Sequence, residues 1–231
     1  MKKWMMLSLG VVGCLGLGSG AFAQTNAILD FTSFLYESGP NDLYPEFHSA
    51  AGEIMTCVGY IENVSPELNW DQTQVELTFV MTDLVSQGEI EYPGNLFYIL
   101  YTGGSLDIVA QRYDDPAYTL PDYGIDPPNA TAPSTFWDGE IYLHGVFTSF
   151  YMTYYPTLHA GNFEGHLVWT SGTQLDALYP DPVGYTLSGT VDPFGAPVPQ
   201  GYALEADGHI SFDAAIGVEE SSWGQVKNLY R

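Results

Sequence analysis

Short runs of apolar or alternating residues, separated by Gly, Pro, Asn and Asp, recur along the body of the chain. An alternation of period two places every second side chain on the same face of a β-strand. Turn residues at such regular intervals are typical of an antiparallel sandwich or barrel, and we expect a sandwich of jelly-roll type over residues 25–216. The predicted strands are residues 52–64, 74–84, 95–102, 105–112, 139–155, 165–170, 184–191 and 208–216.

Glycines mark several of the predicted turns. Gly103 and Gly104 separate two apolar runs and predict a two-residue hairpin. A triplet of Gly, then Glu or His, then Ile or Leu is interpreted as a turn-ending glycine of positive φ followed by the start of a strand. The triplet begins at Gly52, Gly88, Gly139, Gly165 and Gly208.

Two segments interrupt the strand pattern. Residues 112–135 are rich in proline, aspartate and tyrosine and predict a long, partly rigid loop. Residues 171–180, "SGTQLDALYP", predict one or two helical turns, with Ser171 or Thr173 as the cap and Pro180 as the stop.

The first 23 residues have the layout of a secretory signal peptide. Two lysines precede an apolar run from Trp4 to about Leu17, and small residues lead to Ala21-Phe22-Ala23. Cleavage is expected after Ala23, which predicts a secreted, extracellular or cell-surface protein. The alternative is a lipoprotein, because residues 11–14 loosely resemble a lipobox that would make Cys14 the lipidated residue.

Cysteine usage and charge restrict the partners. After cleavage Cys57 is the one remaining cysteine, so no intramolecular disulfide can form, and its apolar surroundings predict a buried, inert thiol. The mature chain holds 28 Asp and Glu against Arg112, Lys227 and Arg231. Binding to nucleic acid or to an anionic membrane surface requires several clustered cations, so we expect neither partner.

The amino-acid composition supports the prediction of β-strands. The chain contains 17 Tyr, 12 Phe, 25 Gly and 15 Pro, a balance that suits strands and turns better than helices. Phosphate-binding glycine loops and a Gly-x-Ser-x-Gly nucleophile motif are absent from the sequence. The leading hypothesis is therefore a secreted, non-enzymatic structural or adhesive protein without a cofactor.

Acidic and histidine residues supply weaker hypotheses. Glu140 and Glu164 lie on neighbouring predicted strands and are candidates for the carboxylate pair of a glycoside hydrolase. His144, Glu164 and His166 would form a zinc site if their strands paired in a suitable register. Candidate calcium ligands are the loop carboxylates Asp114, Asp115, Asp122 and Asp126.

Aromatic residues suggest the second function, carbohydrate binding. Tyrosine rings have an apolar face and a polar tip, and exposed rings can stack on sugars. The candidates for such a platform are Tyr113, Tyr118, Tyr123, Tyr151, Tyr154 and Tyr155. The expected partner is a polysaccharide or a cell-surface protein.

Residues 217–231 predict a short C-terminal helix. Trp223, Val226 and Tyr230 fall on one helical face, and Lys227 and Arg231 lie where the helix dipole favours cations. So short a helix is frayed in water unless it docks on something. The ending from Trp223 to Arg231 resembles the short Trp-Gly/Lys/Tyr-Arg tails of uncharacterised secreted bacterial β-sandwich proteins. The resemblance implies a secretion or attachment signal that is read by sorting machinery.

Overall fold

The computed structural model describes residues 27–39, 47–124, 132–158, 160–178, 184–191 and 198–212. These ranges contain two short helical turns, α1 (Ala132–Thr135) and the 3-10 turn η1 (Leu175–Ala177). All other regular structure is antiparallel β. The strands are β1 (Ala27–Glu37), β2 (Ile54–Val64), β3 (Val75–Tyr92), β4 (Leu96–Arg112), β5 (Glu140–Tyr155), β6 (Ala160–Ser171), β7 (Tyr185–Val191) and β8 (Leu204–Phe212).

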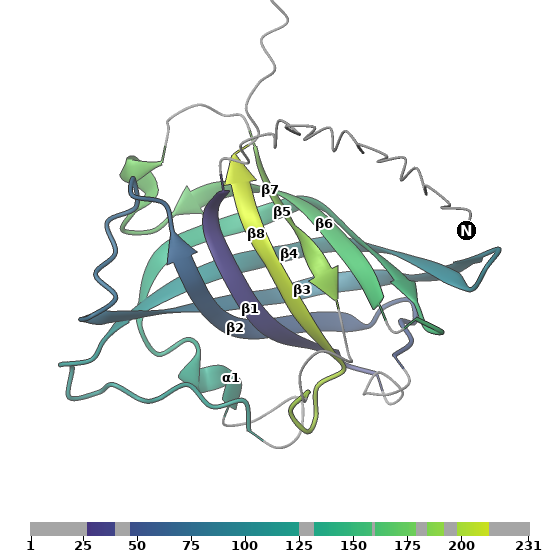
Figure 1. Cartoon of the computed structure of the whole chain (residues 1–231), viewed down its shortest axis with the longest axis horizontal. Helices are drawn as coiled ribbons and strands as arrows, with labels where there is room; N and C mark the ends of the chain where they lie inside the picture. The colour runs from purple at the N-terminus through teal and green to yellow at the C-terminus, as the bar shows by residue number, and fades with distance from the viewer. Residues whose placement is uncertain are drawn as a thin grey trace, which may run out of the picture.

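The strands form a closed barrel in which each pairs with its neighbours in the chain and β8 pairs with β1 (Figure 1). The all-β, antiparallel prediction is confirmed. The jelly-roll sandwich is wrong, because a jelly roll needs crossovers between two sheets and this meander has none among its eight strands. Both folds bury one face of each strand, so alternation along the sequence does not distinguish them.

Several strand boundaries differ from the predicted ones. β1 (Ala27–Glu37) was not predicted, although Leu29, Phe31, Ser33 and Leu35 alternate as inward residues. The two runs at 95–102 and 105–112 form one strand, β4, and β6 begins five residues before the predicted run. β1 was missed because Ser33, a polar residue, occupies one of its inward positions. The other boundaries differ because a hydrogen-bonded ladder can continue where the local hydrophobic pattern stops.

The Gly103-Gly104 hairpin is also wrong. Both glycines have positive φ, of 73° and 85°, but they lie inside β4, where Gly103 pairs with Leu84 of β3. The chain instead reverses between Tyr92 and Leu96, with Gly94 at a φ of 94°. The left-handed glycines are thus used within a paired strand, and β3 and β4 together form a long hairpin.

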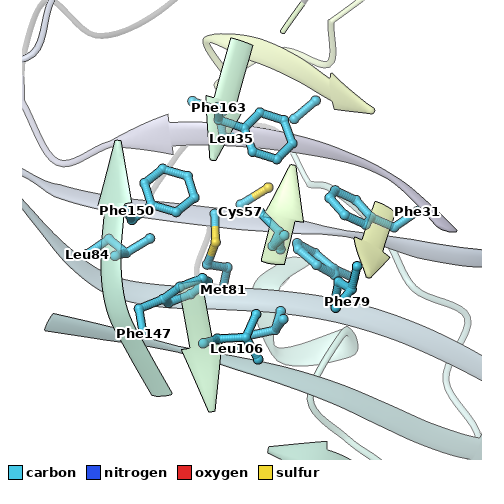
Figure 2. Packing of buried hydrophobic residues seen from close by; sticks show 14 of the residues in the cluster. Phe31, Leu35, Cys57, Phe79, Met81, Leu84, Leu106, Phe147, Phe150 and Phe163 are labelled. Atoms are coloured by element: carbon cyan, nitrogen blue, oxygen red, sulfur yellow. The ribbon is translucent and has the colours of Figure 1, made fainter. Parts of the chain in front are cut away.

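The lumen of the barrel is filled by the inward side chains (Figure 2). Phe31 stacks on Phe79 with ring centroids 4.2 Å apart, and Phe150 stacks on Phe163 at 6.1 Å. A small cavity with apolar walls lies among these rings. The volume in which the centre of a water molecule fits is only about 10 Å³. A cavity of this kind stays dry, so the lumen is a packed core.

The recurring glycine triplet has several structural explanations. Gly52 has a φ of 94° and lies in a turn just before β2, as expected, and Gly139 directly precedes β5. Gly88 also has a positive φ, of 91°, but it lies inside β3, where the pairing with β4 shifts register, so no strand starts there. Gly165 and Gly208 lie in the middle of β6 and β8, where the prediction of strand starts is wrong. A Cβ atom on Gly165 would lie 2.6 Å from the Phe150 ring, and one on Gly208 would lie 2.9 Å from the Phe163 ring. These two glycines make room for aromatic rings in the lumen.

The predicted helical turn after β6 is present as η1. Gln174 precedes it and makes no side-chain capping bond, so neither Ser171 nor Thr173 acts as the expected cap. Leu178 is buried in the core and Leu175 packs against it. This turn contributes to closing the end of the barrel at which β6 finishes.

Within the described residues, the long loop packs on the outside of the barrel around Pro121, Tyr123 and α1. An outer apolar cluster on β1, β2 and β3 is covered by residues 118–124, α1 with its following residue, and residues 198–202. Thr78 Oγ1 donates to the Phe136 carbonyl at 2.8 Å, and Tyr202 Oη donates to the Tyr123 carbonyl at 2.9 Å. The members of this outer cluster are Phe34, Tyr36, Val58, Tyr60, Val80, Tyr123, Phe136, Val198 and Tyr202.

Candidate functional site

The two candidate catalytic glutamates lie far apart. Glu140 is exposed at the start of β5, whereas Glu164 is opposite Tyr151, eleven positions further along β5. At about 3.3 Å per residue this separation is roughly 36 Å along the strand. Paired glycosidase carboxylates are about 5 to 10 Å apart, so the structure does not assemble this pair.

The candidate zinc ligands are divided between two places. Glu164 Oε1 lies 3.4 Å from His166 Nε2, so these two side chains are together. His144 instead contacts Asp107, with Nδ1 and Oδ1 2.5 Å apart, and pairs with Ser171 rather than with His166. Within the described ranges no three His, Cys, Asp or Glu side chains are grouped to hold a metal ion.

The loop carboxylates serve the turns of their own loop. Both oxygens of Asp114 accept hydrogen bonds from Arg112, at 2.9 and 3.0 Å. Asp115 accepts from the Ala117 amide and Asp122 from the Gly124 amide. Each of these three acids is therefore engaged in a bond within its own turn, and Asp126 lies outside the described residues.

The six candidate tyrosines are placed in different environments. Tyr113 and Tyr118 meet edge to face beyond the end of β4, and Tyr123 packs into the outer cluster. Tyr154 points into the barrel against Phe47, and Tyr155 is half-buried at the end of β5. Tyr151 lies on the outer wall beside Leu100, which is thirteen positions and roughly 40 Å along β4 from Tyr113. The six rings do not form one platform.

A different aromatic pair is present on the outer wall of β4 and β5. The rings of Tyr98 and Tyr151 are nearly parallel, with centroids 5.6 Å apart and an interplanar angle of 27°. Leu100, directly opposite Tyr151, is 39% exposed. Tyr98 was not among the tyrosines predicted from the sequence to bind a ligand, although the inward positions of Ile99 and Tyr101 in the same alternating run imply that it faces outward.

Polar side chains extend this face over the next strands. Glu164 lies opposite Tyr151, and its carboxylate contacts His166. His166 Nδ1 is 3.1 Å from the hydroxyl of Thr186 on β7. We call these five residues, Tyr98, Leu100, Tyr151, Glu164 and His166, the Tyr98–Tyr151 face. It has the composition of a binding surface, with apolar rings at one side and hydrogen-bonding groups at the other.

The electrostatics of this face are negative. Partial burial and the Glu164 carboxylate raise the pKa of Tyr151, so its hydroxyl stays protonated and can donate a hydrogen bond. In the described part of the chain Arg112 is the one Lys or Arg, and it is paired with Asp114 beyond the other end of β4. The whole chain carries a formal charge of −23. Anionic ligands are therefore repelled from the Tyr98–Tyr151 face.

A set of buried, hydrogen-bonded polar side chains lies at one end of the barrel. Glu37 is 2% exposed, accepts a hydrogen bond from the Tyr101 hydroxyl, and accepts another from Ser49 Oγ at 3.1 Å. Ser49 Oγ also lies 2.7 Å from Ser86 Oγ. These bonds hold residues 47–50 across the barrel end, where Phe47 packs on Tyr154. Their arrangement anchors a segment and does not resemble a substrate site.

Cys57 is confirmed as a buried thiol. Its Sγ donates to Ser33 Oγ at 3.1 Å, and burial raises its pKa to about 12. A thiol with so high a pKa is not a nucleophile at neutral pH.

The two terminal predictions fall on other parts of the chain. The signal peptide with Cys14, and the tail with Trp223, Val226, Lys227, Tyr230 and Arg231, lie outside the described residues. Over the part that the structure covers, no helix is both long and apolar enough to cross a membrane. The chain matches no family model, and no curated protein or solved structure is significantly similar to it.

Proposed function

We propose that this protein is a secreted or cell-surface, non-enzymatic structural or adhesive protein that acts through the outer wall of its barrel. One observation carries the proposal: the lumen is filled by the protein's own side chains. An eight-stranded barrel either encloses a small ligand or packs its interior. With the interior occupied, the outer wall is the surface that remains for binding.

The N-terminal sequence supports the location. Two lysines, an apolar run and Ala21-Phe22-Ala23 form the layout that signal peptidase recognises. The closed barrel suits an extracellular protein, because closure leaves no unpaired strand edge to aggregate. In the proposal, the C-terminal tail serves as a sorting or attachment signal.

Fractionation of a bacterial host that expresses the full chain tests the location. We expect the protein in the medium or on the cell surface, with an intact mass that begins at Gln24. A Cys14→Ser variant should be processed in the same way, whereas loss of processing would favour the lipoprotein. Cytoplasmic protein that retains Met1 would overturn the proposal.

Deletion of residues 218–231 tests the tail separately. A sorting signal predicts that the truncated protein keeps its melting temperature and loses its surface location. An unchanged location with a lowered melting temperature would show that the tail instead docks on the barrel.

A further inference from the structure

The outer wall of the barrel has two faces of different character. On β1, β2 and β3 part of the wall carries the outer cluster, which loop residues cover. On β4 to β7 the outward residues include the Tyr98–Tyr151 pair and many hydroxyl and amide groups, among them Thr153, Asn162 and Thr190 in one cross-strand row. Side chains along this second face are half-buried or exposed.

We propose that the Tyr98–Tyr151 face binds a neutral polysaccharide. This inference rests on the proposed function and names the ligand class for the outer wall. The two nearly parallel rings and Leu100 provide an apolar strip on which the C–H faces of sugar rings stack. The adjoining Glu164 carboxylate, which lies 3.4 Å from His166 Nε2, has further lone pairs that accept hydrogen bonds from sugar hydroxyls.

The ring geometry separates this pair from the other outer tyrosines. The Tyr113 and Tyr118 rings are 77° apart and Tyr118 donates to Glu76, so the edge of one ring covers the face of the other. Tyr123 makes edge contacts with Phe34 and Tyr202 in the outer cluster. In contrast, the nearly parallel rings of Tyr98 and Tyr151 cover at most one face of each other, so each keeps its second face for a sugar ring.

Charge selects among polysaccharides. A chain with a formal charge of −23 repels uronic-acid and sulfated polymers. Neutral polymers escape this penalty, and their hydroxyl groups match the serine, threonine, asparagine and histidine side chains around the rings. Neutral glycans are therefore the ligand that both the rings and the charge favour.

Retention on insoluble polysaccharides tests the proposal. The probes are cellulose, chitin and curdlan as neutral polymers, with calcium alginate gel as the anionic control. We expect the purified protein to be retained by at least one neutral polymer and not by alginate. Tyr151→Ala and Tyr98→Ala should each weaken that binding by about tenfold or more.

The matched control is Tyr113→Ala, which removes an exposed tyrosine at the opposite end of the barrel. This variant should bind as tightly as the wild type, and all three variants should keep similar melting temperatures. No retention of the wild type on any neutral polymer, or equal losses in all three variants, would overturn the proposal. So would a dimer that dissociates on Tyr151→Ala, because the face would then be a contact between two copies. The location and cleavage of the protein are measured in an experiment separate from polysaccharide retention. The proposed location can therefore fail while sugar binding is confirmed, and the reverse.

Discussion

Single atoms decide the packing of the lumen, and Gly165 is the clearest case. An added Cβ would lie 2.6 Å from Cδ2 of Phe150 and 2.9 Å from Cε1 of Phe147. We expect Gly165→Ala to lower the free energy of unfolding by about 1–3 kcal/mol, because rings in a full core must shift. Chemical denaturation measures the loss.

Asn162→Ala, at an exposed position of the same strand, is the control and should change stability by less than about 0.5 kcal/mol. Adding Phe147→Leu to Gly165→Ala should recover part of the loss. If Gly165→Ala is as stable as the Asn162 variant, the lumen is looser than its geometry indicates.

Glu76 makes stability depend on pH. Burial raises the pKa of its carboxyl, with a smaller opposing effect from the Tyr118 hydroxyl. The folded state therefore binds the proton more tightly than the unfolded state, and stability falls as pH rises from the ordinary glutamate pKa of 4.5 through the higher folded value. Above that window the loss persists.

Glu76→Gln removes this charge and keeps an acceptor for Tyr118. We expect the variant to be more stable than the wild type at pH 7, and the difference to vanish below pH 4.5. Denaturation curves at several pH values measure this. Glu140→Gln, at the exposed start of β5, should show no such pH-dependent gain, and an equal gain there would attribute the effect to net charge alone.

At the scale of elements, the proline-rich loop behaves as part of the fold. Phe136, directly after α1, is 0% exposed and packs beside Tyr60 and Tyr123 in the outer cluster. The composition of this loop predicted only a long, partly rigid connection. Packing against the outside of β1 to β3 holds the loop where Tyr123 and Phe136 join the outer cluster.

Phe136→Ala should therefore cost about 3–5 kcal/mol in the free energy of unfolding, as much as a core residue. The neighbouring Trp137, 42% exposed, supplies the control, and Trp137→Ala should cost far less. Denaturant unfolding followed by circular dichroism compares the two. Equal, small losses would mean that the loop rests on the barrel without stabilising it.

For the whole molecule, the formal charge of −23 opposes folding by self-repulsion. We expect the melting temperature to rise as NaCl is increased from about 10 mM to 500 mM, because screening shortens the range of the repulsion. Differential scanning calorimetry measures this change. A falling melting temperature would show that favourable ion pairs outweigh the repulsion.

The melting temperatures in calcium and in magnesium, compared at the same concentration, test whether the loop acids bind calcium. Because Asp114, Asp115 and Asp122 are engaged in separate local bonds, CaCl₂ and MgCl₂ should raise the melting temperature equally. A larger rise with calcium would favour a specific calcium site.

The order of hydrophobic and polar residues was enough to predict most strands, the antiparallel all-β class and the buried Cys57. Each depends on neighbours in the chain: alternation decides which face a side chain occupies, and turn residues limit the length of a strand. The Tyr98–Tyr151 face was within reach of the same rule, since Ile99 and Tyr101 face inward.

Tertiary structure decided which strands are partners. Pairing of β1 with β8 closes a barrel where a sandwich was expected, and register separates Glu140 from Glu164 and His144 from His166. It also brings Tyr98 beside Tyr151. These outcomes depend on contacts between residues distant in sequence, and the local pattern of each strand does not specify its partner or its register.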